Sequence, residues 1–139
     1  AKSLSGLVFG AVRGHYYVGL EEAMRQNLIQ RIDTKTELVS IKRMLAGRVD
    51  VTSVPASTLK YFMKSLSIAD QIYTSPTPLV SYSRHIMLTK SLLAEHKQLQ
   101  KQVLALDTNP DWQAILIKYG LLADKNENWH GDSAWVIFE

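Results

Sequence analysis

Residues 7–12 read Leu7-Val8-Phe9-Gly10-Ala11-Val12, and no other stretch says as much about the fold class. The run is short and apolar, with Gly6 before it and Arg13-Gly14 after it. Because no polar residue occupies alternate positions, the run predicts a strand that is covered on both faces. Strands of this kind are typical of parallel sheets with a layer of helices on each side.

Two helices are expected beyond this strand. From Val18 to about Arg31 the apolar residues recur at three- and four-residue spacing, which predicts an amphipathic helix. Residues 28–32 either close that helix or begin a second strand. Thr34-Lys35-Thr36-Glu37 matches a capping box, so we expect the Thr34 hydroxyl to cap a second helix. That helix should run to about Ala46 and end at Gly47 in a left-handed turn.

A further strand and helix follow this pair. Residues 48–54 alternate in polarity and are rich in β-branched side chains, so they predict a strand. Pro55 is expected to be the first residue of the next helix, which runs through Met63. The order strand, helix, strand, helix predicts an α/β fold whose parallel sheet has right-handed crossovers.

The pattern changes in the second half of the chain. Ser75-Pro76-Thr77-Pro78 favours extended backbone, and residues 82–88 predict a strand beyond it. Two helices are expected at residues 91–106 and 111–119, separated by Asn109-Pro110. Residues 133–138 form either a late strand or an exposed apolar segment.

The composition limits the classes of function. The 139 residues are 46% hydrophobic and 21% charged, which is typical of one soluble globular domain. No apolar run approaches the roughly 20 residues of a transmembrane helix. The absence of cysteine excludes disulfides and argues against zinc, and we expect neither a metal nor a cofactor. The net charge of +3 is not gathered into the basic stripe of a nucleic-acid binder, so no nucleic-acid partner is expected.

Four segments, taken in order, resemble parts of one protein family. They are residues 3–14, 44–51, 85–91 and 117–121. They look like the turn and strand that open a second lobe, a helix end with its following strand, a return strand ending in Ser/Thr-Lys, and a C-terminal helix end. Together they resemble the second lobe of periplasmic solute-binding proteins that serve polar-amino-acid ABC transporters.

The resemblance implies an organisation and a function. It implies that residues 1–81 form the parallel-sheet lobe of a type II periplasmic-binding-protein-like fold. Residues 82–122 would be a return strand and helices that pack on an N-terminal lobe, and residues 123–139 would be a tail. It implies a periplasmic or extracytoplasmic protein that binds a small polar or anionic solute, such as an amino acid, without catalysis. Its partner would be an ABC permease or, in the alternative of a sensory ectodomain, a transmembrane signalling protein.

Two segments are expected to form the ligand site at the C-terminal edge of the sheet. They are Arg13-Gly14-His15-Tyr16-Tyr17, between a strand and a helix, and Ser53-Val54-Pro55, at the end of the next strand. Backbone N–H groups, the positive end of the helix and Arg13 favour an anion, and Gly14 allows close approach to the backbone. The alternative is that Gly14 only permits a tight turn, while Tyr16 and Tyr17 pack on the lobe.

Two residues narrow the choice of ligand. His15 has no cysteine or second histidine beside it, so it is expected to hydrogen-bond or stack on a ligand, or simply to be exposed, rather than to bind a metal. Pro55 stands where the resembling family carries an acidic residue for the ammonium group of its ligand. An amino acid would leave that ammonium unpaired in a closed cleft, which is costly. This favours another small anion, or a protein that senses rather than transports.

Other functions need features that this sequence does not offer. A dehydratase-like enzyme on the same fold needs a positioned acid and base, and His15 is the only candidate near the cleft. The effector domain of a transcription regulator would come with a helix-turn-helix, which is not present. The apolar faces of helices 91–106 and 111–119 would be exposed unless another chain covered them, so we expect a homodimer or larger assembly. Trp112, Trp129 and Trp135 are expected to pack rather than to form ligand platforms.

Overall fold

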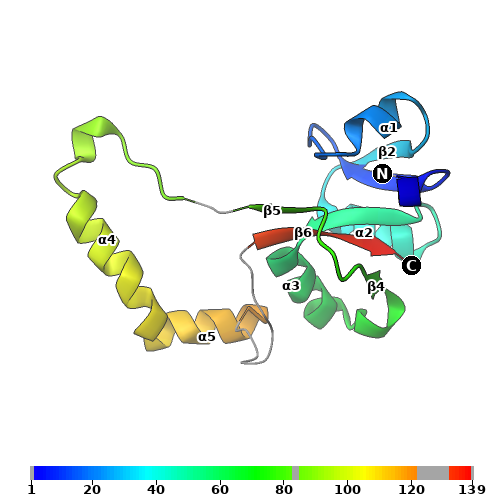
Figure 1. Ribbon diagram of the computed structural model, residues 1–139. Helices are drawn as coiled ribbons and strands as arrows, with labels where there is room; N and C mark the ends of the chain where they lie inside the picture. The colour runs from blue at the N-terminus through cyan, green and yellow to red at the C-terminus, as the bar shows by residue number, and fades with distance from the viewer. Residues whose placement is uncertain (1, 83–84, 122–131, 139) are drawn as a thin grey trace. The chain divides into compact units, whose positions relative to one another are not determined.

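The predicted strand at residues 7–12 forms β1 (Val8–Val12), which has a parallel neighbour on each side in the computed structural model (Figure 1). β2 (Gln30–Thr34) places Gln30 opposite Val8, and β3 (Val51–Pro55) places Val51 opposite Phe9. The structure describes residues 2–82, 85–121 and 132–138. The fold class is confirmed at the coarse level: the protein is mixed α/β and contains a three-stranded parallel sheet.

β6 (Asp132–Phe138) extends the sheet beyond β3 and runs antiparallel to it. Along its other side β6 pairs with two short antiparallel strands, β4 (Tyr73–Thr74) and β5 (Val80–Tyr82). The strand order is β2-β1-β3-β6-β4, with β5 also on β6 (Figure 1). Of the two expectations for residues 133–138, the late strand is therefore confirmed.

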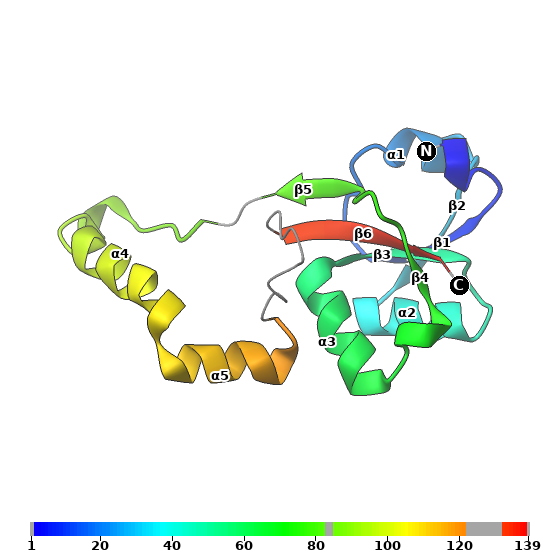
Figure 2. The ribbon, with the colours of Figure 1, turned by 60° about the horizontal axis from the view of Figure 1, so that its bottom comes forward.

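Helices cover both faces of the sheet. α1 (Glu21–Arg25) lies on one face, and α2 (Glu37–Leu45) and α3 (Ala56–Leu66) lie on the other (Figure 2). The connection from β1 to β2 runs in one direction along the sheet, and the connection from β2 to β3 runs back past β1. Because right-handed crossovers in opposite directions must use opposite faces, α1 and α2 are separated by the sheet.

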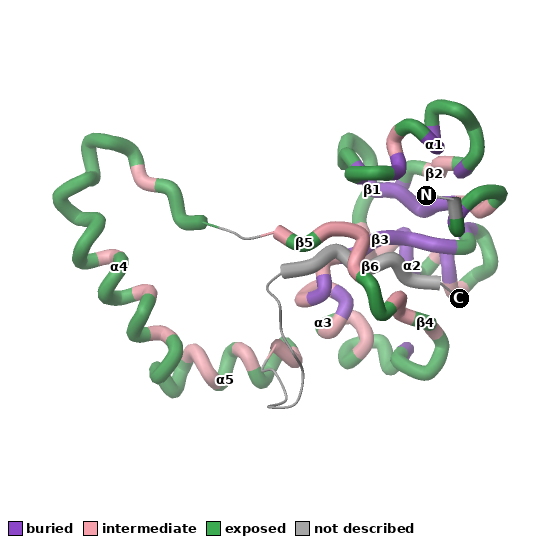
Figure 3. The backbone as a smooth tube through the Cα atoms, viewed as in Figure 1, coloured by how far each residue is buried: buried purple, intermediate pink, exposed green. Residues whose placement is uncertain are grey.

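Each face has its own hydrophobic core, and burial is concentrated on β1 and β3 (Figure 3). The core under α1 consists of Leu4, Phe9, Ala11, Tyr17, Leu20, Ala23, Met24, Ile29 and Val51. The core under α2 and α3 consists of Ile41, Met44, Val49, Val54, Leu59 and Ile68. Gly10 permits close packing on this second face, because a Cβ atom there would lie 3.1 Å from Val49 Cγ2 and 3.4 Å from Ser40 Oγ.

The first helix is shorter than predicted. The prediction of a helix from Val18 to Arg31 is wrong over most of its length, because α1 ends at Arg25 and Asn27 takes a left-handed conformation with φ of 57°. Ile29 is buried in the core beneath α1 and leads into β2. Residues 28–32 therefore begin a strand, which was one of the two alternatives.

Thr36, and not Thr34, caps α2. The Thr36 hydroxyl accepts a hydrogen bond from the Val39 N–H at 3.3 Å. Thr34 is the last residue of β2, and its buried hydroxyl donates to the Ala11 carbonyl at 2.9 Å and lies 2.7 Å from Ser40 Oγ. The prediction of Thr34 as the cap is wrong because the strand continues through this residue.

Two helix ends follow their local signals closely. Gly47 ends α2 with φ of 62°, as predicted for a glycine that follows the last helical turn. Pro55 is the last residue of β3 and the N-cap residue of α3, one position before the predicted first helical residue. The strand therefore passes into α3 without a loop.

The chain divides into two compact units, Ala1–Tyr82 with His130–Glu139, and Ser83–Trp129. The segment that we expected to be a tail contributes β6 to the first unit. The second unit contains α4 (His96–Ala105) and α5 (Pro110–Tyr119), with short 3-10 turns at Lys90–Leu92 and Leu106–Thr108. The two predicted helices and the break between them are thus confirmed, and no residue of 85–121 is buried (Figure 3).

The strand predicted at residues 82–88 does not form as expected. β5 ends at Tyr82, and residues 85–88 have no regular secondary structure. Ser83 and Arg84 lie outside the described residues, as does Trp129. Alternation of apolar residues alone does not make a strand, because a strand also needs a neighbour whose backbone groups it can pair with.

Candidate functional site

The carboxyl ends of β1 and β3 meet at one edge of the sheet. The register Gly10 to Thr52, carried on by two residues, brings Val12 level with Val54. The chain leaves β1 for α1 on one face and leaves β3 for α3 on the other (Figure 2). Two adjacent parallel strands whose connections diverge in this way leave a crevice between them, and open α/β sheets bind their ligands at such a point.

The loop at residues 13–17, called here the Gly14 loop, begins at this edge. The Arg13 N–H donates to the Thr34 carbonyl at 3.0 Å, and the His15 N–H donates to the Val12 carbonyl at 3.0 Å. Gly14 has φ of 78°, and a Cβ atom built there would meet no atom within 4 Å. Arg13, Gly14, His15 and Tyr16 are all exposed, and Tyr16 keeps 73% of its surface accessible. The loop therefore presents its backbone and three side chains to solvent.

Tyr17 has a different place in the loop, because its side chain is buried. Its ring packs edge-on against Phe9, with the ring centres 4.9 Å apart, and the His15 ring centre is 6.4 Å away. The Tyr17 hydroxyl accepts a hydrogen bond from the Val12 N–H at 2.8 Å. Burial raises the pKa of the Tyr17 phenol above its ordinary value of 10.0, although the Val12 N–H and the Arg31 charge oppose the shift.

The start of α1 already carries negative charge. Glu21 and Glu22 lie in its first turn, and the Glu21 carboxylate accepts a hydrogen bond from the Tyr17 N–H at 2.7 Å. α1 is also only five residues long, so it has little dipole to offer an anion. α3 begins at the same sheet edge with Pro55 as its N-cap, no capping side chain and no acidic residue in its first turn. Of these two helix starts, that of α3 is the one suited to a negative group.

The second predicted segment, Ser53-Val54-Pro55, lies beside the Gly14 loop. Val54 is completely buried in the core beneath α2 and α3, so its side chain cannot reach a ligand in the crevice. Ser53 is also buried, and Pro55 is half-buried where β3 meets α3. The structure therefore brings both predicted segments to one edge, with Arg13, Gly14, His15 and Tyr16 as the exposed residues of the set.

Sequence reasoning missed Arg31, Glu21 and Asp33, which form a charged cluster beside the loop. The Arg31 Nε donates to Asp33 Oδ1 at 2.9 Å, and Arg31 Nη1 lies 3.8 Å from Glu21 Oε1. The alternation of charged and apolar residues in 30–34 was the available signal for a strand. It did not show that Arg31 would lie against a loop that precedes it by 14 residues or more.

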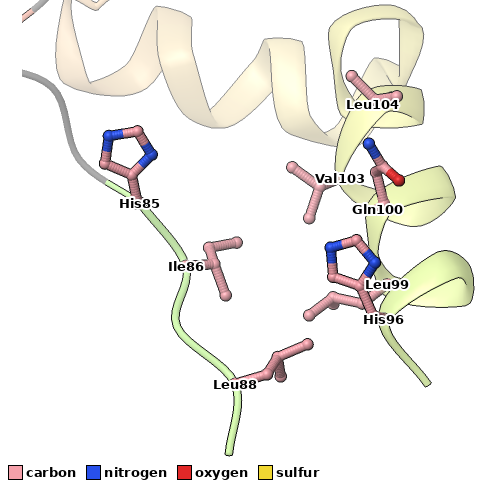
Figure 4. A pocket seen from close by; sticks show the side chains of 8 residues that line it. All are labelled: His85, Ile86, Leu88, His96, Leu99, Gln100, Val103 and Leu104. Carbon is pink, nitrogen blue, oxygen red and sulfur yellow. The ribbon is translucent and has the colours of Figure 1, made fainter. Parts of the chain in front are cut away.

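A second hollow lies in the other unit, between residues 85–88 and α4 (Figure 4). Its volume is about 280 Å³, and Ile86 and Leu88 point across it toward α4. It is lined by His85, Ile86, Leu88, His96, Leu99, Gln100, Val103 and Leu104. Most of this lining is aliphatic, so the hollow does not share the charged and backbone-rich character of the sheet edge.

Comparison of the chain with protein families, curated proteins and solved structures finds no significant match. None of the helices in the described part of the chain has the length and apolar character needed to cross a lipid bilayer. Within the described residues, no three His, Cys, Asp or Glu side chains gather in a way that could hold a metal ion. The function must therefore be argued from the sheet edge itself.

Proposed function

We infer that this chain is a solute-binding lobe of an extracytoplasmic binding protein, and that it takes a small anionic or polar solute at the carboxyl edge of its sheet. The observation that carries the proposal is the diverging pair β1 and β3, with the exposed Gly14 loop at the end of one strand and the start of α3 at the end of the other. The two-lobed, type II binding-protein-like organisation belongs to this proposal as well.

The chemistry of the edge favours an anion. Arg13 and His15 are exposed on the Gly14 loop, and α3 begins there without an acidic residue in its first turn. Pro55 provides no carboxylate for a ligand ammonium group. A carboxylate or phosphate would accept hydrogen bonds from backbone N–H groups and interact with the Arg13 charge. An amino acid would have to find its ammonium partner elsewhere.

The proposed lobe acts by binding and closure rather than by catalysis. Gly14 lets the solute approach the backbone, the exposed Tyr16 ring can cover its apolar part, and a second lobe would exclude water from the other side. Closure of two lobes around a solute provides a surface that a membrane partner can recognise. That partner is an ABC permease in the transport version of the proposal and a transmembrane signalling protein in the sensory version.

A titration followed by amide chemical shifts tests the proposal. The whole chain is titrated with L-glutamate, succinate, inorganic phosphate and, as a cation, spermidine. We expect one or more anions to shift the amides of Gly14, His15 and Tyr16, with an affinity of about millimolar because one lobe provides half of the contacts. Spermidine should leave these amides unchanged.

Arg13→Ala and Arg48→Ala form a matched pair for the same titration. Arg48 is also exposed, but it precedes β3 and so lies at the opposite edge of the sheet. Arg13→Ala should weaken the anion response by about tenfold, since a charge-assisted contact is lost, and Arg48→Ala should not. Equal losses in both variants, or shifts that avoid residues 13–16, would show that the anions respond to net charge and not to this site.

A further inference from the structure

Arg31 links the Gly14 loop to the rest of the sheet edge. It lies on β2 opposite Phe9 of β1, and its side chain is only 25% exposed. Its Nε donates to Asp33 Oδ1 at 2.9 Å, and its Nη1 lies 3.8 Å from Glu21 Oε1. Because two carboxylates hold two different nitrogens, the plane of the guanidinium group is fixed.

The third nitrogen of the same group reaches the loop backbone. Arg31 Nη2 donates to the His15 carbonyl at 3.1 Å and to the Val12 carbonyl at 3.4 Å. Its guanidinium carbon lies 5.6 Å from the centre of the Tyr17 ring. The carbonyl groups on both sides of the Arg13-Gly14 turn therefore meet a single cation.

The side chains of the loop do not account for this ordering. Arg13, His15 and Tyr16 are exposed and Gly14 has no side chain, so none of these residues is held by packing in a core. The backbone is instead held at its two ends by polar contacts, through Arg31 and through the Tyr17 hydroxyl. A site that uses loop backbone to bind a solute gains affinity when that backbone is ordered beforehand, because less freedom is lost on binding.

We propose that Arg31 is a positioning residue of the solute site, which holds the Gly14 loop in its receptive shape without touching the solute. The purpose assigned to the loop rests on the proposed function, whereas its ordering by Arg31 is measurable without any solute. Lysine cannot replace Arg31, because a single ammonium group cannot keep the Asp33 contact, reach two carbonyl groups and lie over Tyr17 at the same time.

Amide hydrogen exchange of the whole chain tests this role in Arg31→Lys and in Arg25→Lys. Arg25 is a matched control, since it is an arginine of the same unit that pairs with Glu22 on the exposed surface of α1. In Arg31→Lys we expect the amides of Gly14 and Tyr16 to exchange about tenfold faster, while those of Phe9 and Val51 keep their rates. Arg25→Lys should change neither group.

Asp33→Asn serves as a second variant that keeps Arg31 but weakens its alignment. It should raise the Gly14 and Tyr16 exchange rates in the same direction by a smaller factor. Unchanged loop rates in Arg31→Lys overturn the proposal. Rates that rise equally in the loop and in β1 overturn it as well, because they show a loss of stability throughout the unit.

Titration with L-glutamate, succinate and inorganic phosphate separates this inference from the proposed function. An anion that shifts the Gly14 amide of the wild-type chain should bind Arg31→Lys about tenfold more weakly. Equal affinity in the two chains overturns the positioning role and leaves the proposed function standing. If no anion shifts that amide in the wild-type chain, the proposed function fails, and the exchange rates still decide whether Arg31 orders the loop.

Discussion

At the scale of single residues, Tyr16 and Tyr17 show how adjacent identical side chains divide their roles. The ring of Tyr17 lies in the core against Phe9, and its hydroxyl accepts the Val12 N–H, so it supports the loop from behind. Tyr16 faces solvent. The sequence predicted both as contact residues or, in the alternative, both as packing residues, and the structure places one in each environment.

Tyr17→Phe should destabilise the protein through one hydrogen bond. The variant keeps the ring and removes the acceptor of the Val12 N–H, which stays buried, so we expect a loss of about 1–3 kcal/mol in the free energy of unfolding. Urea denaturation measures this loss. Tyr16→Phe is the matched control and should stay within about 0.5 kcal/mol of the wild type, because its side chain is exposed. Equal effects of the two variants would contradict the role given to the Tyr17 hydroxyl.

The raised pKa of Tyr17 predicts a loss of stability at alkaline pH. Burial raises the pKa of the phenol in the folded state, so the folded chain keeps this proton at a pH where the unfolded chain has released it. The contribution is complete below about pH 10 and declines as the pH rises through the folded-state pKa. Urea denaturation at roughly pH 8 and roughly pH 11 should show a steeper decline for the wild type than for Tyr17→Phe. Parallel declines would remove Tyr17 as the cause.

The candidate site could be predicted only as far as strand order reaches. Gly14 and Ser53 each follow a strand of a parallel sheet, so their meeting at one edge follows from the order of elements alone. Arg31 could not be found in this way, because 16 residues separate it from His15 and only the pairing of β1 with β2 joins them. Sequence spacing shows where strands lie along the chain, but not which loops their side chains reach.

At the scale of elements, local signals predicted what short-range chemistry controls. The runs at residues 7–12 and 48–54 became β1 and β3, Gly47 ended α2, and Asn109 caps α5 by accepting the Trp112 N–H. The errors fall where a distant partner decides. β2 extends through Thr34 because β1 pairs with it at every residue, and this moves the cap of α2 to Thr36.

Thr36→Ala tests the observed cap of α2. The Thr36 hydroxyl accepts the Val39 N–H, and removing an N-cap side chain costs about 1 kcal/mol of stability. Thermal or urea unfolding should show this loss, and Thr36→Asp should restore most of it because aspartate is also a good N-cap residue. A neutral Thr36→Ala would mean that the Thr36 hydroxyl bond adds nothing to the stability of α2.

At the scale of the whole molecule, the two units differ in how they are held. The first unit has a core on each face of its sheet, whereas residues 85–121 of the second unit contain no buried residue. The second unit is inserted between β5 and β6, which are antiparallel neighbours with Tyr82 opposite Asp132. The insertion therefore leaves and rejoins the sheet at one pair of adjacent residues.

Replacing residues 83–131 by a short Asn-Gly turn should leave the first unit folded. Tyr82 and Asp132 are paired, so a turn of about two residues can join them as in a hairpin. We expect the shortened chain to keep its cooperative urea transition and the amide chemical shifts of β1 and β3. Loss of the cooperative transition would show that the second unit contributes to the stability of the first.

The whole chain is expected to self-associate through its second unit. Met87 is 91% exposed and Leu93 is 73% exposed, and contiguous apolar surface of this kind favours association. Sedimentation at micromolar concentration should show a dimer or a larger species for the whole chain and a monomer for the shortened chain. A monomeric whole chain would contradict this expectation.

The position of β6 in the sheet has a consequence for how the protein is made. β6 pairs with β3 on the side away from β1, yet residues 56–131 separate the two strands along the chain. During translation β3 leaves the ribosome with one edge bare, and that edge waits on the order of ten seconds for its partner at ordinary elongation rates. An unpaired strand edge is a template for other chains, so a chaperone that binds extended apolar backbone should meet this nascent protein before its sheet is complete.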